Sequence, residues 1–179
     1  FLEANVQTAM VNLKHLLQKR LEFPSLKAPA IFIRPRNIEM AKHIVDWDLN
    51  QTFNGMILPK FNIHNLISWM DVLPANLQYM PTLETKEIFD ISHNIELYQA
   101  LKYDFHKTLC LRVGGNDLLS CLNLRRPKNT TIYQTPVGIL ISQLAGLFIP
   151  NGFQLSSPVC EHFENTQLLM QELAQDMNN

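Results

Sequence analysis

The chain has 179 residues, of which 46% are apolar, and its 15 basic side chains nearly balance its 16 acidic ones. This length predicts one domain with enough apolar material for a packed core, and the composition excludes a disordered chain. The formal net charge of −1 excludes a broad basic surface for nucleic acid. No uncharged apolar run reaches the length of a membrane span. We therefore expect neither nucleic acid nor a membrane as a partner.

The cysteines indicate a reducing compartment. Cys110, Cys121 and Cys160 are isolated, odd in number and without a CxxC spacing, which is typical of cytoplasmic proteins rather than of secreted disulfide scaffolds. The chain begins with Phe1 rather than Met and shows no signal-peptide pattern. We expect a cytoplasmic protein, and we expect this chain to be the covered part of a longer one.

Short apolar runs alternate with helical patterns along the chain. Residues 1–3 are interpreted as the remnant of a first strand, and Val6, Met10, Leu13 and Leu17 have the spacing of one helix face. In chain order, the remaining elements are predicted as strand 30–34, helix 37–47, strand 55–59, helix 62–70, strand 77–83, helix 95–101, strand 108–113, helix 134–148, a weaker strand 153–157 and helix 161–177.

The spacing of the strands predicts an α/β fold with a parallel sheet. Their centres fall near residues 32, 57, 80 and 111, and such separations are long enough for the helical crossover that joins parallel strands. We count about six βα units in a single domain over residues 1–179. An open doubly wound sheet could be complete with six units, whereas a (β/α)8 barrel would be incomplete. Periodicity alone leaves both architectures open.

Polar residues follow the predicted strands at their carboxyl ends. They are Arg34, Lys60, Glu84, Asp117 and Glu161, and this edge of a parallel α/β sheet is where ligands bind. Glu84 and Asp117 come from consecutive strands and could hold Mg²⁺, which leaves coordination positions for water and substrate. Such an ion stabilises an enolate, and Arg34 could clamp a substrate carboxylate. The pattern predicts a site that makes or breaks a C–C bond beside a carbonyl.

Structural explanations exist for the same residues. Asp117 and Glu84 could cap the helices that follow them, Arg34 could be a surface residue between two prolines, and Lys60 could be a solvated turn lysine. These alternatives stay open on spacing alone.

Gly114 and Gly115 precede a predicted helix. They could cradle a phosphate at its N-terminus or form a tight turn, and we count them with Arg34, Lys60 and Glu161 as candidate substrate-binding residues. No GxGxxG, P-loop or HExxH motif occurs, which disfavours an open-sheet nucleotide-binding protein and a histidine-rich zinc site.

Four segments resemble motifs of the citrate lyase β-subunit-like branch of the HpcH/HpaI aldolase superfamily, in the family's order and spacing. They are Ile33-Arg34-Pro35-Arg36-Asn37, Gly55-Met56-Ile57-Leu58-Pro59-Lys60, Met80-Pro81-Thr82-Leu83-Glu84-Thr85 and Leu111-Arg112-Val113-Gly114-Gly115-Asn116-Asp117-Leu118. Later segments at 132–138, 152–153 and 157–161 are most similar to a subgroup described as C–C bond lyases of the TIM-barrel fold, found beside bacterial tellurium-resistance genes.

The resemblance implies an Mg²⁺-dependent (β/α)8 barrel that acts on a 2-oxo acid or an acyl thioester carried by coenzyme A or by a carrier protein. By its motifs, Glu84 and Asp117 would bind Mg²⁺ and Arg34 would contact the substrate carboxylate. The sequence departs from the family where Glu3 is followed by Ala4 instead of the usual Asp. The family's first and last strands are also missing.

Two classes of function therefore remain. One is an Mg²⁺-dependent C–C lyase or aldolase, which needs Arg34, Glu84 and Asp117 to converge. The other is a non-catalytic barrel that serves as a subunit or scaffold of a biosynthetic complex, which does not need that convergence. The substrate and the oligomeric state, including a homo-oligomer, are left open.

Overall fold

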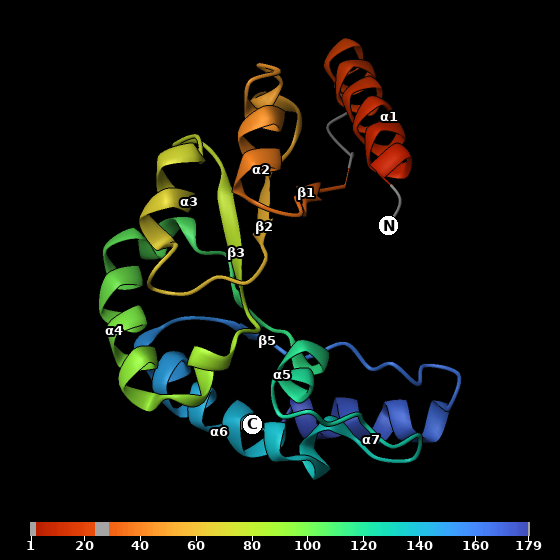
Figure 1. Ribbon diagram of the computed structural model, residues 1–179, viewed down its shortest axis with the longest axis vertical. Coiled ribbons are helices and arrows are strands. Elements are labelled where there is room, and N and C mark those ends of the chain that lie inside the picture. Colours follow the sequence, from red (N-terminus) through yellow and green to blue (C-terminus); the bar gives the residue numbers. More distant parts are fainter. Residues whose placement is uncertain (1–2, 24–28, 179) are drawn as a thin grey trace.

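The computed structural model describes residues 3–23 and 29–178, which form a twisted parallel sheet with helices packed against it (Figure 1). The sheet has five strands in the order β1-β2-β3-β4-β5, and each strand pairs in parallel with the next along the chain. They are β1 (Phe32–Ile33), β2 (Gly55–Leu58), β3 (Gln78–Leu83), β4 (Leu111–Val113) and β5 (Leu155–Ser156). This sequential order confirms the predicted parallel α/β architecture and is the order found in a barrel wall.

Helices follow the strands as the alternation predicts. The α-helices are α1 (Glu3–Glu22), α2 (Ile38–Val45), α3 (Leu66–Val72), α4 (Ile91–Leu101), α5 (Gly115–Cys121), α6 (Pro136–Phe148) and α7 (Thr166–Asp176), and short 3-10 turns lie at Asn50–Thr52, Lys86–Phe89, Lys102–Lys107, Ile132–Gln134 and Ile149–Asn151. Within residues 3–23 and 29–178, none of the helices combines the length and apolar character needed to cross a membrane.

The start of α2 has a clear chemical cause. Asn37 is extended, and its side-chain oxygen accepts a hydrogen bond from the Met40 N–H at 3.0 Å. This bond satisfies one of the N–H groups that a helix leaves free at its first turn. The following helix therefore begins where the sequence predicts, immediately after the Arg34 segment, and it fixes the point at which the chain leaves the sheet.

The two faces of the sheet differ in burial. Met56, Leu58, Leu83 and Leu111 are fully buried, because side chains of their face pack under the helices. On the other face, Ile57, Met80 and Arg112 are only half-buried. The half-buried face is the inner side of the barrel wall, and it is the face that carries the polar residues of the site.

The interpretation of residues 1–3 as the remnant of a strand is wrong for Glu3, which opens α1; Phe1 and Leu2 lie outside the described residues. The helix predicted from the spacing of Val6, Met10 and Leu13 begins earlier, at Glu3. A carboxylate is favoured there by the helix dipole. Leu17 is the fully buried residue of α1. The described chain consequently has five strands, one fewer than the expected number of βα units.

A buried ion pair holds the last helix against the loop that follows α5. The Arg126 guanidinium donates to both carboxylate oxygens of Glu172, at 2.9 and 2.7 Å, and to the Val159 carbonyl at 3.2 Å. The Glu172 carboxylate also accepts from the Ile132 N–H at 3.2 Å. These bonds offset the cost of burying both charges, and they fix Val159, which lies at the site described below.

Gly55 allows β1, β2 and β3 to approach one another. A Cβ atom on this residue would lie 2.0 Å from the carbonyl oxygen of Gln78 and 2.7 Å from the Phe32 ring. The first of these neighbours is backbone and cannot turn aside. The position therefore accepts only glycine without displacing a strand.

We expect Gly55→Ala to lower the free energy of unfolding by at least about 1–3 kcal/mol, the usual cost of overpacking, and thus the melting temperature by roughly 2–4 °C for each kcal/mol. Gly146→Ala is the matched control, because no atom lies within 4 Å of a Cβ there. In a helix this control should stabilise by about 0.5–1 kcal/mol. Equal melting temperatures for the two variants would contradict the close-packing account.

Candidate functional site

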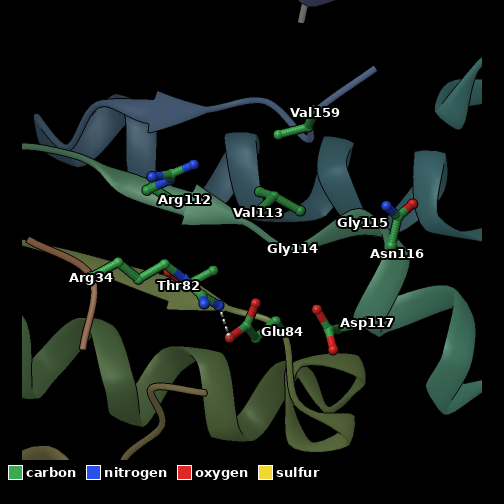
Figure 2. A pocket seen from close by; sticks show the side chains of 10 residues that line it. All are labelled: Arg34, Thr82, Glu84, Arg112, Val113, Gly114, Gly115, Asn116, Asp117 and Val159. Carbon is green, nitrogen blue, oxygen red and sulfur yellow. Dashed lines mark hydrogen bonds and ion pairs between the residues drawn. The ribbon is translucent and has the colours of Figure 1, made fainter. Parts of the chain in front are cut away.

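A cavity of about 200 Å³ opens at the carboxyl ends of β1, β3 and β4 (Figure 2). Arg34 follows β1, Glu84 follows β3, and Asp117 lies in the first turn of α5, directly after β4. The structure thus brings these three predicted site residues together. The full lining consists of Arg34, Thr82, Glu84, Arg112, Val113, Gly114, Gly115, Asn116, Asp117 and Val159.

The Glu84 carboxylate is the most buried charge of the cavity, with 5% of the residue exposed. Its Oε1 atom accepts a hydrogen bond from the Lys60 backbone N–H at 2.8 Å and lies 3.5 Å from Nη2 of Arg34. Both contacts end on Oε1. Within the described part of the chain, no hydrogen-bond or ion-pair partner reaches Oε2.

Lys60 contributes through its backbone. The residue has a positive φ of 50°, and its N–H points to Glu84. Its exposed side chain lies along an apolar groove between α1 and α2 that also includes Met10 and Met40. The structure therefore places the Lys60 ammonium outside the lining of the cavity, in agreement with the solvated turn lysine that we considered.

The two glycines after β4 are required by close packing. A Cβ atom at Gly114 would lie 2.4 Å from Cβ of Glu84, and one at Gly115 would lie 2.8 Å from Cβ of Pro158. Gly114 thus lets the turn between β4 and α5 pass directly over Glu84. This contact supports the tight-turn interpretation over a phosphate cradle.

Neither Asp117 nor Glu84 caps the helix that follows it. Gly114 occupies the N-cap position of α5, and Asp117 is the third residue of the helix. Thr85, after Glu84, precedes a 3-10 turn but makes no side-chain capping bond. Asp117 is exposed toward the cavity, where the N-terminal end of the helix favours its negative charge.

The two carboxylates of the cavity influence each other's charge. Burial raises the pKa of Glu84 above its ordinary value, and the negative charge of Asp117 raises it further. The Lys60 N–H, and then the charges of Arg34 and Lys60, lower the pKa of Glu84, but by less in total than burial and Asp117 raise it. A cation bound between the two carboxylates would relieve this repulsion.

The donor set fits Mg²⁺ and does not fit a caged metal. Among residues 3–23 and 29–178 there is no group of three or more His, Cys, Asp and Glu side chains that could enclose an ion. Two carboxylates with access to water and substrate form the kind of open set that Mg²⁺ accepts. The free Oε2 atom of Glu84 and the exposed Asp117 carboxylate are the protein ligands available for it.

Glu161 does not line this cavity, so the structure does not place it with the substrate-binding residues as we expected. It lies in a neighbouring cavity with Arg125 and Arg126, and its Oε2 is 3.9 Å from Nε of Arg126. Arg126 holds the segment after β5 through the Val159 carbonyl. Glu161, two residues further on, therefore lies beside Arg126 and not at the carboxyl ends of β3 and β4.

Sequence reasoning missed Arg112 and Thr82 as site residues. Arg112 lies inside a short apolar strand, and only the alternation of β4 places it on the same face as Gly114. Thr82 stands in register beside it on β3. The signal that could have found Arg112 is a charged residue in a strand that is otherwise apolar.

This sheet, with its polar residues gathered at the carboxyl ends of parallel strands, defines an α/β-barrel protein with a site in the usual place for that fold. A family model described as C–C bond lyase of the TIM-barrel fold matches residues 2–179, so the chain belongs to this family. The match confirms the predicted resemblance to the C–C bond lyases of the TIM-barrel fold, and with it the barrel fold. No curated protein matches the chain.

The raised pKa of Glu84 predicts a pH-dependent stability. The folded state holds the proton more tightly than the unfolded state, so the contribution of Glu84 to stability is greatest below the unfolded pKa and is lost as pH rises through the folded pKa. In metal-free buffer, Glu84→Gln should therefore melt at a higher temperature than the wild type at neutral pH, and the difference should vanish toward about pH 4.

Thermal unfolding monitored by circular dichroism over that pH range is the measurement. Glu164→Gln, which removes the same charge from an exposed turn, is the control. A lower melting temperature for Glu84→Gln at neutral pH would show that the ionised carboxylate stabilises the metal-free fold, contrary to this account.

Proposed function

We propose that this cavity catalyses the making or breaking of a C–C bond beside the carbonyl of a small 2-oxo acid or acyl thioester. The observation that carries the proposal is the convergence of Glu84, Asp117 and Arg34 in one cavity at the carboxyl ends of parallel strands. A scaffold subunit does not require this convergence. The gathered charges therefore support the enzyme over the scaffold.

Glu84 and Asp117 are the proposed Mg²⁺ ligands. Bound Mg²⁺ supplies polarisation of a carbonyl and stabilisation of an enolate charge. The buried position of Glu84 keeps water away from one side of the site, and the Lys60 N–H holds Oε1 so that Oε2 keeps its orientation. Asp117 sits on α5, so the two carboxylates that would hold the ion come from different elements.

Arg34 is the proposed partner of the substrate carboxylate. Its side chain is 52% exposed, and its contact with Glu84 is long, at 3.5 Å. Such a pair contributes little to stability, and it leaves most of the donors of the planar guanidinium free for a ligand. That planar fork matches a carboxylate in two parallel hydrogen bonds.

The proposed substrate is small, and the proposed location of the protein is the cytoplasm. The cavity of about 200 Å³ suits a small acid or the acyl end of a thioester, so a coenzyme or carrier would remain outside it. Cys110, Cys121 and Cys160 are free thiols, as expected in the cytoplasm.

Calorimetric titration with Mg²⁺ tests the metal site. Because loss of even an outer-shell partner weakens metal binding by about 10–100-fold, Asp117→Asn should weaken it by at least that factor. Glu161→Gln is the matched control, since it removes a carboxylate from the neighbouring cavity. Unchanged Mg²⁺ affinity in Asp117→Asn, or an equal loss in Glu161→Gln, would contradict the assignment.

A further inference from the structure

A second arginine enters the cavity from the opposite side of Thr82. Arg112 is on β4 and Arg34 follows β1, and both line the cavity (Figure 2). Arg112 is paired in register with Thr82 of β3 and Ser156 of β5, neither of which carries a charge. Its position in the sheet therefore provides no carboxylate for it.

The Arg112 guanidinium makes no hydrogen bond or ion pair with any residue in 3–23 or 29–178. The ion pair of this cavity joins Glu84 to Arg34 instead. Arg112 is half-buried, yet none of its nitrogens is among the buried unpaired atoms of the described residues, so the guanidinium stays accessible from the cavity that it lines. Its planar set of donors is therefore available to an anionic group bound in the cavity.

Thr82 provides a second observation on the same wall. The residue is 5% exposed, and its Oγ1 atom is buried without a hydrogen-bond partner in the described part of the chain. Buried hydroxyl groups are normally satisfied. Thr82 and Arg112 therefore stand side by side in register on the cavity wall, and neither side chain has a hydrogen-bond partner among the described residues.

The charges of the cavity indicate how many negative charges a ligand should carry. Its charged lining residues are Arg34, Arg112, Glu84 and Asp117, which sum to zero. With the divalent cation that the proposed function places on the two carboxylates, the site has an excess of two positive charges. A monoanion would leave one of them uncompensated.

We infer that the natural ligand is a small dianion, with a carboxylate held by Arg34 and a second anionic group held by Arg112. This inference rests on the proposed function, because it counts the charge of the metal. It makes Arg112 a specificity-determining residue that selects oxo acids with a second acidic group. Carboxylate and phosphonate groups share the required chemistry.

The test compares three probes that differ at one end. They are 2-oxopentanedioate, its monocarboxylate analogue 2-oxopentanoate, and 2-oxo-4-phosphonobutanoate, each titrated by calorimetry in the presence of Mg²⁺. The wild type should bind one or both dianions at least about tenfold more tightly than 2-oxopentanoate, because a charge-assisted contact corresponds to about a 10- to 150-fold change in affinity. The tighter of the two dianions identifies the second group.

Two arginine variants should then separate the roles. Arg112→Gln should weaken binding of the dianions by about 10- to 150-fold and change the affinity for 2-oxopentanoate by less than about threefold. Arg34→Lys should weaken the binding of all three probes. Arg125→Gln, at an exposed position outside the lining, is the control and should change none. Melting temperatures verify that each variant is folded, and Arg112→Lys replaces Arg112→Gln if the latter is not.

Equal affinities of the wild type for dianions and monoanion would overturn the inference, as would an equal loss for all probes in Arg112→Gln. Both of these results leave the proposed function standing. If none of the three oxo acids binds, the inference falls together with the substrate class of the proposed function. The Mg²⁺ titration of Asp117→Asn decides the metal site separately.

Discussion

The buried carboxylate of Glu84 joins three parts of the barrel wall at one point. Glu84 directly follows β3, accepts a hydrogen bond from the Lys60 N–H in the turn after β2, and pairs with Arg34 from the segment after β1. Gly114 lets the turn after β4 pass over it, since any side chain there would collide with Glu84. The Lys60 and Arg34 contacts both end on Oε1, so Oε2 remains beside Gly114 at the cavity that Asp117 also lines (Figure 2).

The two faces of the sheet differ in how fully their polar and charged groups are paired. The outer face of the sheet is closed by apolar packing under the helices, and the Arg126–Glu172 pair fixes the last helix. The inner face instead keeps a carboxylate with a raised pKa and an arginine without a partner among the described residues. Ligands bound to these groups would stabilise the folded protein.

The alternation of strands and helices made the fold and the convergence of Arg34, Glu84 and Asp117 predictable, because carboxyl ends of parallel strands share one edge. Other features depend on contacts that no local pattern contains. The sequence suggested a strand remnant at Glu3, where helical periodicity prevails. It could not tell that Lys60 acts through its N–H, nor that Arg126 pairs with a glutamate 46 residues away. The apolar residues on either side of Arg112 gave no indication that it lines the site.

The central claim is that this cavity stabilises an enolate, and hydrogen exchange at the carbon beside the carbonyl measures that step directly. With Mg²⁺ in deuterated water, proton NMR should show the wild type exchanging the C3 protons of 2-oxopentanedioate well above the rate of Mg²⁺ alone. In Asp117→Asn the exchange should fall by about 100-fold or more, as when a charge-stabilising group is removed from an active site. Exchange no faster than with Mg²⁺ alone, or unchanged in Asp117→Asn, would contradict the claim.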